Sequence, residues 1–215
     1  WRGASCSALR VRDSYWLFDV GEGTQIQLQK AAVRASRIDR IFITHAHGDH
    51  CFGLPGLLCL IGQGRSPSAP PVQIYGPPGL RAFVKITLAF TGTRMLPPYS
   101  IHELHDIPDL RRPDRVAKQN LGAVPPPSHD NSGRNWGEVG GTDTPPASDG
   151  SWWTLFHEDG VKVCAAPLTH TVPTVGFIVT EDDKPGRLLV DKVMPHINRN
   201  SEMPATNLYI PMELL

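Results

Sequence analysis

The sequence lacks an excess of charge of either sign. Among its 215 residues, lysine and arginine number 21 and aspartate and glutamate also number 21, so the formal net charge is zero. Proteins that bind nucleic acids through a broad surface usually carry a basic excess. The balance therefore counts against a large polyanion-binding surface, although it leaves room for a local basic patch.

Long apolar runs and paired cysteines are missing as well. The longest apolar stretch, near Leu54–Ile61, is far shorter than the roughly 20 residues of a membrane-spanning helix. Four scattered cysteines form no C-x-x-C pair, which is typical of a reduced, intracellular protein: Cys6, Cys51, Cys59 and Cys164. No signal peptide is visible. The chain starts at Trp1, so we expect its natural N-terminus, with any targeting segment, to be missing.

Strand and helix patterns alternate along most of the chain. Apolar runs that end in turn residues predict strands over 14–23, 39–44, 72–76 and 174–183. Helical composition or spacing predicts helices over 24–38, 53–64 and 78–90. A turn at Asp159-Gly160 predicts a hairpin between residues 151 and 168. This alternation is typical of an α/β protein.

Two segments carry no clear pattern. Residues 123–150 are rich in Pro, Gly, Ser and Asp and predict a long flexible loop. Residues 191–215 show no clear period and are left unassigned as a divergent tail. We therefore predict one partial domain over residues 1–190, followed by that tail.

The densest group of reactive side chains lies in the segment THAHGDHCFGLPG, residues 44–56. It follows a predicted strand, precedes a helix and holds four possible metal ligands: His45, His47, Asp49 and His50. The first two histidines are two residues apart, so both rings face one side of an extended stretch. Gly48 lets the chain turn and present the other two side chains elsewhere. Four such ligands can serve two metal ions ~3.5–4 Å apart.

The types of ligand indicate the metal and its chemistry. Imidazole and carboxylate without thiolate favour zinc, with manganese or iron as alternatives. Two such cations would lower the pKa of a shared water toward ~7 and neutralise an oxyanion, which serves hydrolysis. The alternatives are a surface loop with unrelated histidines and a structural zinc site. Structural sites prefer cysteine, and we predict that the adjacent Cys51 is a small buried residue instead.

The signature H-x-H-x-D-H resembles the metallo-β-lactamase superfamily, and its flanks resemble ribonuclease Z, the tRNA 3′-processing endonuclease, in its short form. Four blocks in the family's order carry the resemblance: FDVGEGTQIQLQ (18–29), THAHGDHCFGLPGLL (44–58), PLTHTVPTVGF (167–177) and EDDKPGRL (181–188). It spans about residue 2 to about residue 188 and corresponds to the family's N-terminal half. It implies an α/β fold, the αβ/βα sandwich, without its first strand and its C-terminal half.

The resemblance implies a zinc site with two ions in the complete enzyme. His45, His47 and His170 would bind one zinc, and Asp49 and His50 would bind the other. Asp49 would also accept a proton from the attacking water, which makes it the expected catalytic residue.

The remaining polar residues receive other interpretations. Asp19 would hold the histidine turn, residues 44–50, in place as an outer partner of the ligands. The alternative is an ordinary turn aspartate at a strand end. Five histidines lack a comparable context and are predicted not to be ligands: His102, His105, His129, His157 and His196. The first two fall in a stretch that reads as a strand end.

Several blocks of the family do not appear in this chain. They are a basic arm that grips tRNA, a bridging aspartate, a histidine that protonates the leaving group and a last ligand histidine. Asp191 comes too early to be the bridging aspartate and is predicted to be solvated. Without that carboxylate, two dications would face too little negative charge, so we expect one zinc, held by His45, His47 and His170.

Three hypotheses follow. The first is a zinc-dependent endoribonuclease that removes 3′ trailers from tRNA precursors by phosphodiester hydrolysis, present here as a truncated form. The second is a catalytically inactive truncated form that binds zinc or a partner chain. The third is another phosphodiesterase, or an arylsulfatase, of the same fold. The resemblance also implies a homodimer in the complete enzyme, no membrane association, and a cytoplasmic or nuclear location.

Overall fold

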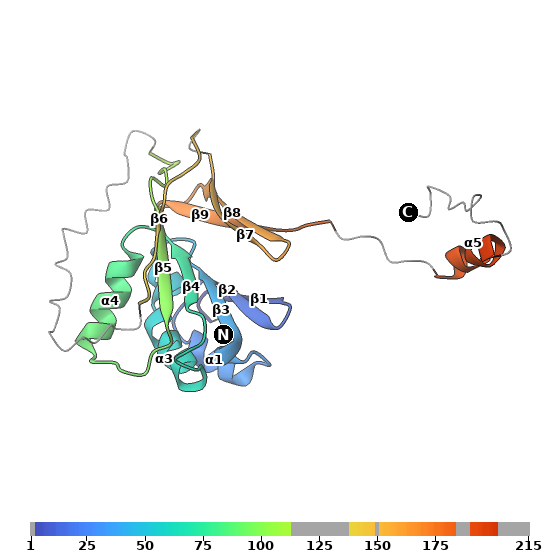
Figure 1. The fold of residues 1–215 in the computed structure, drawn as a ribbon. Coiled ribbons are helices and arrows are strands. Elements are labelled where there is room, and N and C mark those ends of the chain that lie inside the picture. The colour runs from blue at the N-terminus through green and yellow to red at the C-terminus, as the bar shows by residue number, and fades with distance from the viewer. Residues whose placement is uncertain (1–2, 113–137, 149–150, 184–189, 202–215) are drawn as a thin grey trace. The chain divides into compact units, whose positions relative to one another are not determined.

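The computed structural model describes residues 3–112, 138–148, 151–183 and 190–201 (Figure 1). The chain divides into two compact units, Trp1–Thr180 and Glu181–Leu215, which are described separately. Among the described residues, no helix has the length and apolar character needed to cross a membrane.

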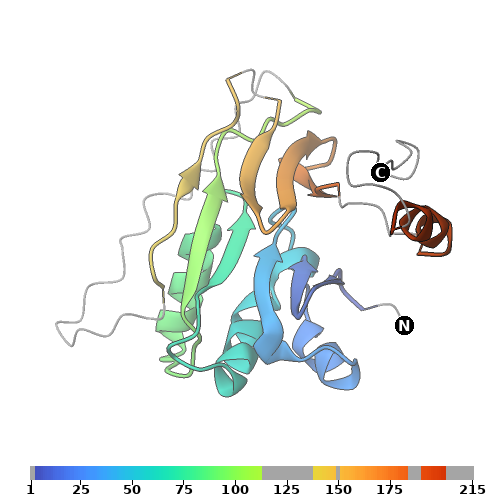
Figure 2. The same cartoon turned by 45° about the vertical axis from the view of Figure 1, so that its right-hand side comes forward.

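The first unit is built on a six-stranded sheet with the order β1-β2-β3-β4-β5-β6. Its strands are β1 (Ser7–Val11), β2 (Ser14–Phe18), β3 (Ile38–Phe42), β4 (Val72–Gly76), β5 (Tyr99–Leu104) and β6 (Asp143–Thr144). The first pair is antiparallel, and every later neighbouring pair is parallel. Parallel neighbours need crossover connections, and three helices supply them from β2 to β5: α1 (Thr24–Lys30), α3 (Leu54–Gly64) and α4 (Leu80–Phe90) (Figure 2). The helix predicted over 24–38 is therefore shorter, and a 3₁₀ turn, η1 (Ala35–Arg37), completes that connection.

Alternate residues of the sheet face two apolar layers. On the helical side, Leu17, Ile41 and Ile74 pack with buried residues of α3 and α4. On the other side, aromatic residues such as Phe42 and Tyr75 pack against a second sheet. Strands buried on both faces read as continuous apolar runs, which explains the pattern of residues 39–44.

The second sheet has three strands in the order β7-β8-β9. They are β7 (Trp153–Glu158), β8 (Val161–Leu168) and β9 (Thr174–Glu181). The predicted hairpin turn is confirmed, because Asp159 and Gly160 link β7 to β8 and both have positive φ, 53° and 72°. Two consecutive residues with positive φ are what the tight hairpin turns require.

Part of the segment predicted as a flexible loop is ordered against β5. Residues 138–148 include β6, and the buried Glu138 bridges to Tyr99. The Glu138 carboxylate pairs with Arg81 and Lys85 of α4. Ion pairs rather than periodic apolar residues hold this segment, so the sequence pattern did not reveal it. The rest of the predicted loop, 123–137 and 149–150, lies outside the described residues.

The second unit contains a helix where the tail was left unassigned. Helix α5 (Val190–Ser201) carries Asp191 in its first turn and Arg199 in its last, the charge arrangement that helix ends favour. Asp191 is exposed, as predicted. The helix also contains Pro195, a residue that usually argues against a helix interior. The predicted domain boundary at residue 190 stays a prediction, and residues 202–215 lie outside the described part.

Candidate metal centre

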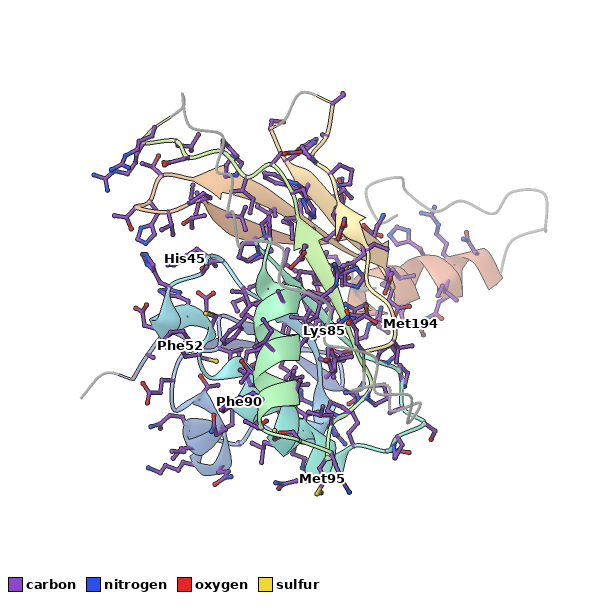
Figure 3. The ribbon with its side chains drawn as sticks, turned by 90° about the vertical axis from the view of Figure 1, so that its left-hand side faces the viewer. His45, Phe52, Lys85, Phe90, Met95 and Met194 are labelled. Atoms are coloured by element: carbon purple, nitrogen blue, oxygen red, sulfur yellow. The ribbon has the colours of Figure 1, made fainter. Side chains whose placement is uncertain are left out.

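The histidine turn joins β3 to a short helix, α2 (Gly48–Cys51), and the backbone fixes it on two sides. Val20 N–H donates to His50 O at 2.7 Å, which ties the turn to the loop after β2. Val175 N–H donates to Thr44 O at 3.0 Å, which ties it to the start of β9. The turn therefore lies at the ends of strands from both sheets. Figure 3 shows His45 at this end of the first unit.

Three imidazoles converge at this point. His45 Nε2 lies 3.1 Å from His47 Nδ1, and His170 Nε2 lies 3.4 Å from that same His47 nitrogen. His170 comes from the loop between β8 and β9, 123 residues away from His47 in the sequence. The expectation that His45 and His47 face one side of an extended stretch is confirmed, since the backbone of His47 is extended.

The spacing of these nitrogens fits one metal ion. Zinc binds imidazole nitrogen at about 2.0–2.1 Å with tetrahedral angles, which places neighbouring ligand atoms about 3.3–3.4 Å apart. The separations of 3.1 and 3.4 Å lie close to that spacing. Neutral imidazoles can exchange few hydrogen bonds among themselves, so converging ring nitrogens favour a cation between them. The residues present therefore fit the one-zinc expectation.

His45 is oriented by a hydrogen-bonded relay behind it. Its Nδ1 lies 2.9 Å from Thr44 Oγ1, and the Thr44 hydroxyl donates to Asp19 Oδ1 at 2.9 Å. Because that hydroxyl gives its proton to the carboxylate, it accepts the Nδ1 proton of His45, and the Nε2 lone pair of His45 points to the cluster. Burial and three neighbouring imidazoles lower the pKa of His45 to about 4. His45 is therefore neutral near pH 7, the form that binds a metal ion.

Asp19 also orients the second half of the turn. Its Oδ2 accepts a hydrogen bond from His50 Nδ1 at 2.7 Å, which leaves His50 Nε2 facing away from Asp19. That second nitrogen lies 3.6 Å from Asp49 Oδ2. The side chain of Asp49 is 68% exposed, whereas the side chain of Asp19 is only 8% exposed. The described residues thus offer two ligand atoms at this second position.

The backbone of Asp19 is held in an uncommon conformation. Its φ is 60°, in the left-handed region that residues other than glycine visit rarely. Its N–H donates to Phe42 O at 2.7 Å, and its side chain accepts from Thr44 N–H at 2.8 Å. These contacts distinguish it from an ordinary turn aspartate. Thr44 is a site residue that sequence reasoning missed, although its place directly before the first histidine was the available signal.

Within the described part of the first unit, His102, His105 and His157 do not belong to this cluster. A second group of possible ligands, Glu103, His105 and Asp143, surrounds Arg81. The guanidinium lies 3.2 Å from Asp143 and 3.6 Å from Glu103, so a cation is already supplied by the chain. His102 lies within β5, as its strand-like context predicted. His157 is exposed on β7, His196 lies on α5, and His129 lies outside the described residues.

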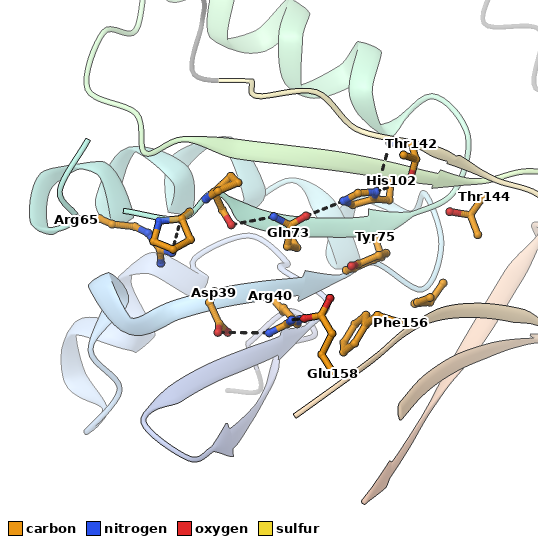
Figure 4. Close-up of a pocket in the computed structure, with 13 residues that line it drawn as sticks. Asp39, Arg40, Arg65, Gln73, Tyr75, His102, Thr142, Thr144, Phe156 and Glu158 are labelled. Carbon is orange, nitrogen blue, oxygen red and sulfur yellow. Dashed lines mark hydrogen bonds and ion pairs between the residues drawn. The ribbon is translucent and has the colours of Figure 1, made fainter. Parts of the chain in front are cut away.

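A separate polar cavity of about 530 Å³ lies between β7 and the inner face of β3, β4 and β5 (Figure 4). Arg40 pairs there with Glu158, and its guanidinium lies 4.4 Å from the Phe156 ring centroid. His102 Nε2 lies 2.7 Å from Gln73 Oε1, and its Nδ1 lies 2.8 Å from Thr142 Oγ1. Arg40, Glu158 and His102 thus have complementary partners, although the buried atoms Arg40 Nε, Arg65 Nε and Asp39 Oδ1 have none. No group of possible metal ligands among the described residues lies in this cavity.

Comparison with known proteins identifies the fold. Residues 1–62 match the family model of the metallo-beta-lactamase superfamily. The human protein named zinc phosphodiesterase ELAC protein 1 is 41% identical over 204 residues, which cover 89% of this chain. Ribonuclease Z of Halalkalibacterium halodurans is 35% identical over 195 residues, again 89% of this chain. The chain has the metallo-β-lactamase fold and resembles the N-terminal half of ribonuclease Z.

A solved structure supports the assignment of this chain to the metallo-β-lactamase fold. The crystal structure of human tRNase Z, short form, is 38% identical, covers 84% of this chain and superposes with a TM-score of 0.65. The match covers 59% of that structure. The chain spans about half the length of the curated relatives it matches, 52% of the human protein and 48% of the bacterial one.

The described helices of the first unit cover one of its two sheets. Every helix of the first unit lies between strands of the first sheet. A helix layer on the second sheet is therefore not found within the described part of that unit.

Proposed function

We propose that this chain carries the metal-binding half of a zinc-dependent endoribonuclease that removes 3′ trailers from tRNA precursors by phosphodiester hydrolysis. The observation that carries the proposal is the convergence of three imidazole nitrogens beside an exposed carboxylate. The relatives named zinc phosphodiesterase and ribonuclease Z provide the reaction class and the RNA substrate.

The residues divide between two metal positions. His45, His47 and His170 would hold the first zinc, for which their spacing is suited. Asp49 and His50 would contribute to a second. When bound, zinc lowers the pKa of a coordinated water and polarises a phosphoryl oxygen.

The exposure of Asp49 supports its proposed role as the proton acceptor. Its carboxylate is exposed, so a water molecule and a substrate phosphate can reach it. It also lies next to His50, whose ring is fixed by Asp19. We propose that Asp49 orients the attacking water and takes its proton, while Asp19 and Thr44 keep the histidine turn in place.

The zero net charge of the chain is compatible with an RNA substrate that is attracted only at the metal centre. With a formal net charge of zero, the chain has no general attraction for RNA phosphate. The phosphate would then be drawn by the metal centre itself. A homodimer, inferred from the family resemblance, stays a prediction.

A second candidate function has its own observation. The second metal position has only two ligand atoms among the described residues. A zinc-binding form without catalysis would have this composition. It predicts zinc binding in the absence of any phosphodiester cleavage.

The experiment separates the two candidates. The zinc-loaded chain is incubated with a 3′-extended tRNA precursor and, separately, with bis-p-nitrophenyl phosphate. Release of an intact 3′ trailer from a tRNA ending in a 3′-hydroxyl supports the nuclease. The variant H47A should lose cleavage, whereas H196A, altered on helix α5 of the second unit, should retain it. Zinc binding without cleavage of either substrate would replace the nuclease by the inactive form.

A further inference from the structure

Phe52 follows the histidine turn and is exposed to solvent. It comes two residues after His50, and 63% of its surface is accessible. Its N–H donates to Gly48 O at 2.9 Å, which completes the single turn of α2. Figure 3 shows Phe52 and His45 at the same end of the first unit.

The ring of Phe52 lies directly on Gly48. A Cβ atom placed on that glycine would come within 2.3 Å of the ring, so a side chain there would displace it. Gly48 stands between His47 and Asp49, so the ring borders the proposed ligands. The ring of Phe83 on α4 lies near it, with ring centroids 6.3 Å apart and ring planes tilted by 33°.

Phe52 and Asp49 share one side of the turn. They are three residues apart in helical backbone, a spacing that makes side chains neighbours. Both are exposed, the carboxylate at 68% and the phenylalanine at 63%. An apolar ring and a carboxylate are thus both exposed to solvent on the turn that carries the proposed ligands.

We propose that Phe52 is a stacking platform for an unpaired nucleobase next to the phosphate held at the metal centre. This inference rests on the proposed function and adds the substrate feature that the site recognises. A nucleobase has an apolar face for the ring and polar edges that tolerate a neighbouring carboxylate. Stacking on an aromatic side chain contributes roughly 1–3 kcal/mol per base and accepts any base.

The position of Phe52 separates it from other exposed apolar residues. Single exposed apolar side chains are common and need no ligand. Phe90 is such a residue, because it ends α4 and is 91% exposed. Phe52 instead contacts the turn that carries the proposed ligands. Because the chain has no net positive charge, RNA affinity has to come from such local contacts.

The test measures binding of a short single-stranded oligoribonucleotide to the zinc-loaded chain. One base carries the fluorescent analogue 2-aminopurine, whose emission is quenched when it stacks. We expect F52A to weaken binding about 5- to 150-fold, the equivalent of the stacking energy, and to abolish the quenching. F52W should bind at least as tightly as the wild type, F52L should behave like F52A, and the matched control F90A should change neither signal.

Several results would overturn the proposal. Unchanged affinity and quenching in F52A, or full affinity in F52L, would exclude stacking. Absence of RNA binding by the wild type would do the same. A shift of F52A from dimer to monomer in sedimentation, with RNA binding intact, would assign the ring to a protein interface instead.

The proposed function is judged by a separate readout. Hydrolysis of bis-p-nitrophenyl phosphate by the wild type, compared with H47A, tests the metal chemistry on a substrate without a nucleobase. A failure of the nuclease proposal is therefore detected as absent hydrolysis of bis-p-nitrophenyl phosphate. A failure of the stacking proposal is detected as unchanged RNA affinity in F52A.

Discussion

Two polar clusters border the first sheet, and they differ in what their groups meet. In the cavity under β7, Arg40 meets Glu158, and both nitrogens of His102 meet polar partners. At the histidine turn, ring nitrogens of His45, His47 and His170 meet one another. Both clusters contain many polar groups, but only the second brings like ligand atoms together. This convergence, rather than the number of polar groups, indicates a metal site.

The two clusters also differ in what holds them. The hydrogen-bonded cavity residues Gln73 and His102 lie on the strands themselves, on β4 and β5. The proposed zinc ligands lie on connections that follow strands, where backbone and Asp19 contacts fix them. In parallel sheets, functional residues commonly lie on the loops at the ends of the strands, where they do not have to maintain the sheet. The following changes test this contrast.

Removal of an imidazole ring from the candidate metal centre should have the largest effect. In H170A, one of three convergent nitrogens is lost, and zinc affinity should fall by about 100-fold or more, beyond the effect typical of an outer partner. The cavity variant H102A should bind zinc like the wild type. Competition with a chromogenic chelator measures both. Equal losses in the two variants would mean that the clusters are not functionally distinct.

Asp19 should come next, since it acts through the histidines that it orients. D19N keeps the shape but weakens the bonds to Thr44 and His50, and zinc affinity should fall about 10- to 100-fold. D39N, in the cavity wall, is the matched control and should retain zinc affinity. An unchanged affinity in D19N would reduce Asp19 to a turn residue.

The buried His102 in the cavity should make the free energy of unfolding depend on pH. Burial, followed by the charge of Arg81, lowers the pKa of His102 below 6.5. The unfolded chain therefore takes up a proton at a higher pH than the folded chain does, and stability falls as the pH drops below 6.5, at no more than about 1.4 kcal/mol per pH unit for one proton. Urea unfolding of the wild type and H102Q between pH 7 and 5, in steps of about one unit, should show a shallower slope in the variant. Parallel slopes would contradict the assignment.

The smallest change is expected from the charge in the cavity. R40M keeps an apolar stem between Trp16 and Phe156 but loses the ion pair to Glu158. We expect a loss of about 1 kcal/mol in the free energy of unfolding and no change in zinc affinity. Denaturant unfolding and chelator competition check the two parts. A loss of zinc from this variant would show that the clusters are coupled.

The sequence predicted the elements that depend on apolar runs and tight turns. Strand β4 has its predicted bounds, and β3 and β9 lie within two residues of theirs, because strands between two apolar layers need continuous apolar residues. It also predicted that His45 and His47 share a side, which follows from the period of an extended chain. The contact of His170 with His47 came from the family resemblance, since spacing says nothing about residues 123 positions apart.

Other parts depend on interactions that no local pattern contains. Helix α5 has apolar residues at helical spacing, Val190, Val193 and Ile197, but Pro195 obscured it. Strand β6 has two residues, too few for any period, and ion pairs of Arg81 and Lys85 hold its segment. The hydroxyl relay through Thr44 requires coordinates, because threonine is a common strand residue.

X-ray absorption at the zinc edge tests the central claim most directly. The account predicts one tightly bound zinc per chain, surrounded by imidazole nitrogen at about 2.0–2.1 Å, and loss of that signal in H47A. A chain that binds no zinc, or zinc with a sulfur ligand at about 2.3 Å from Cys51, would contradict it.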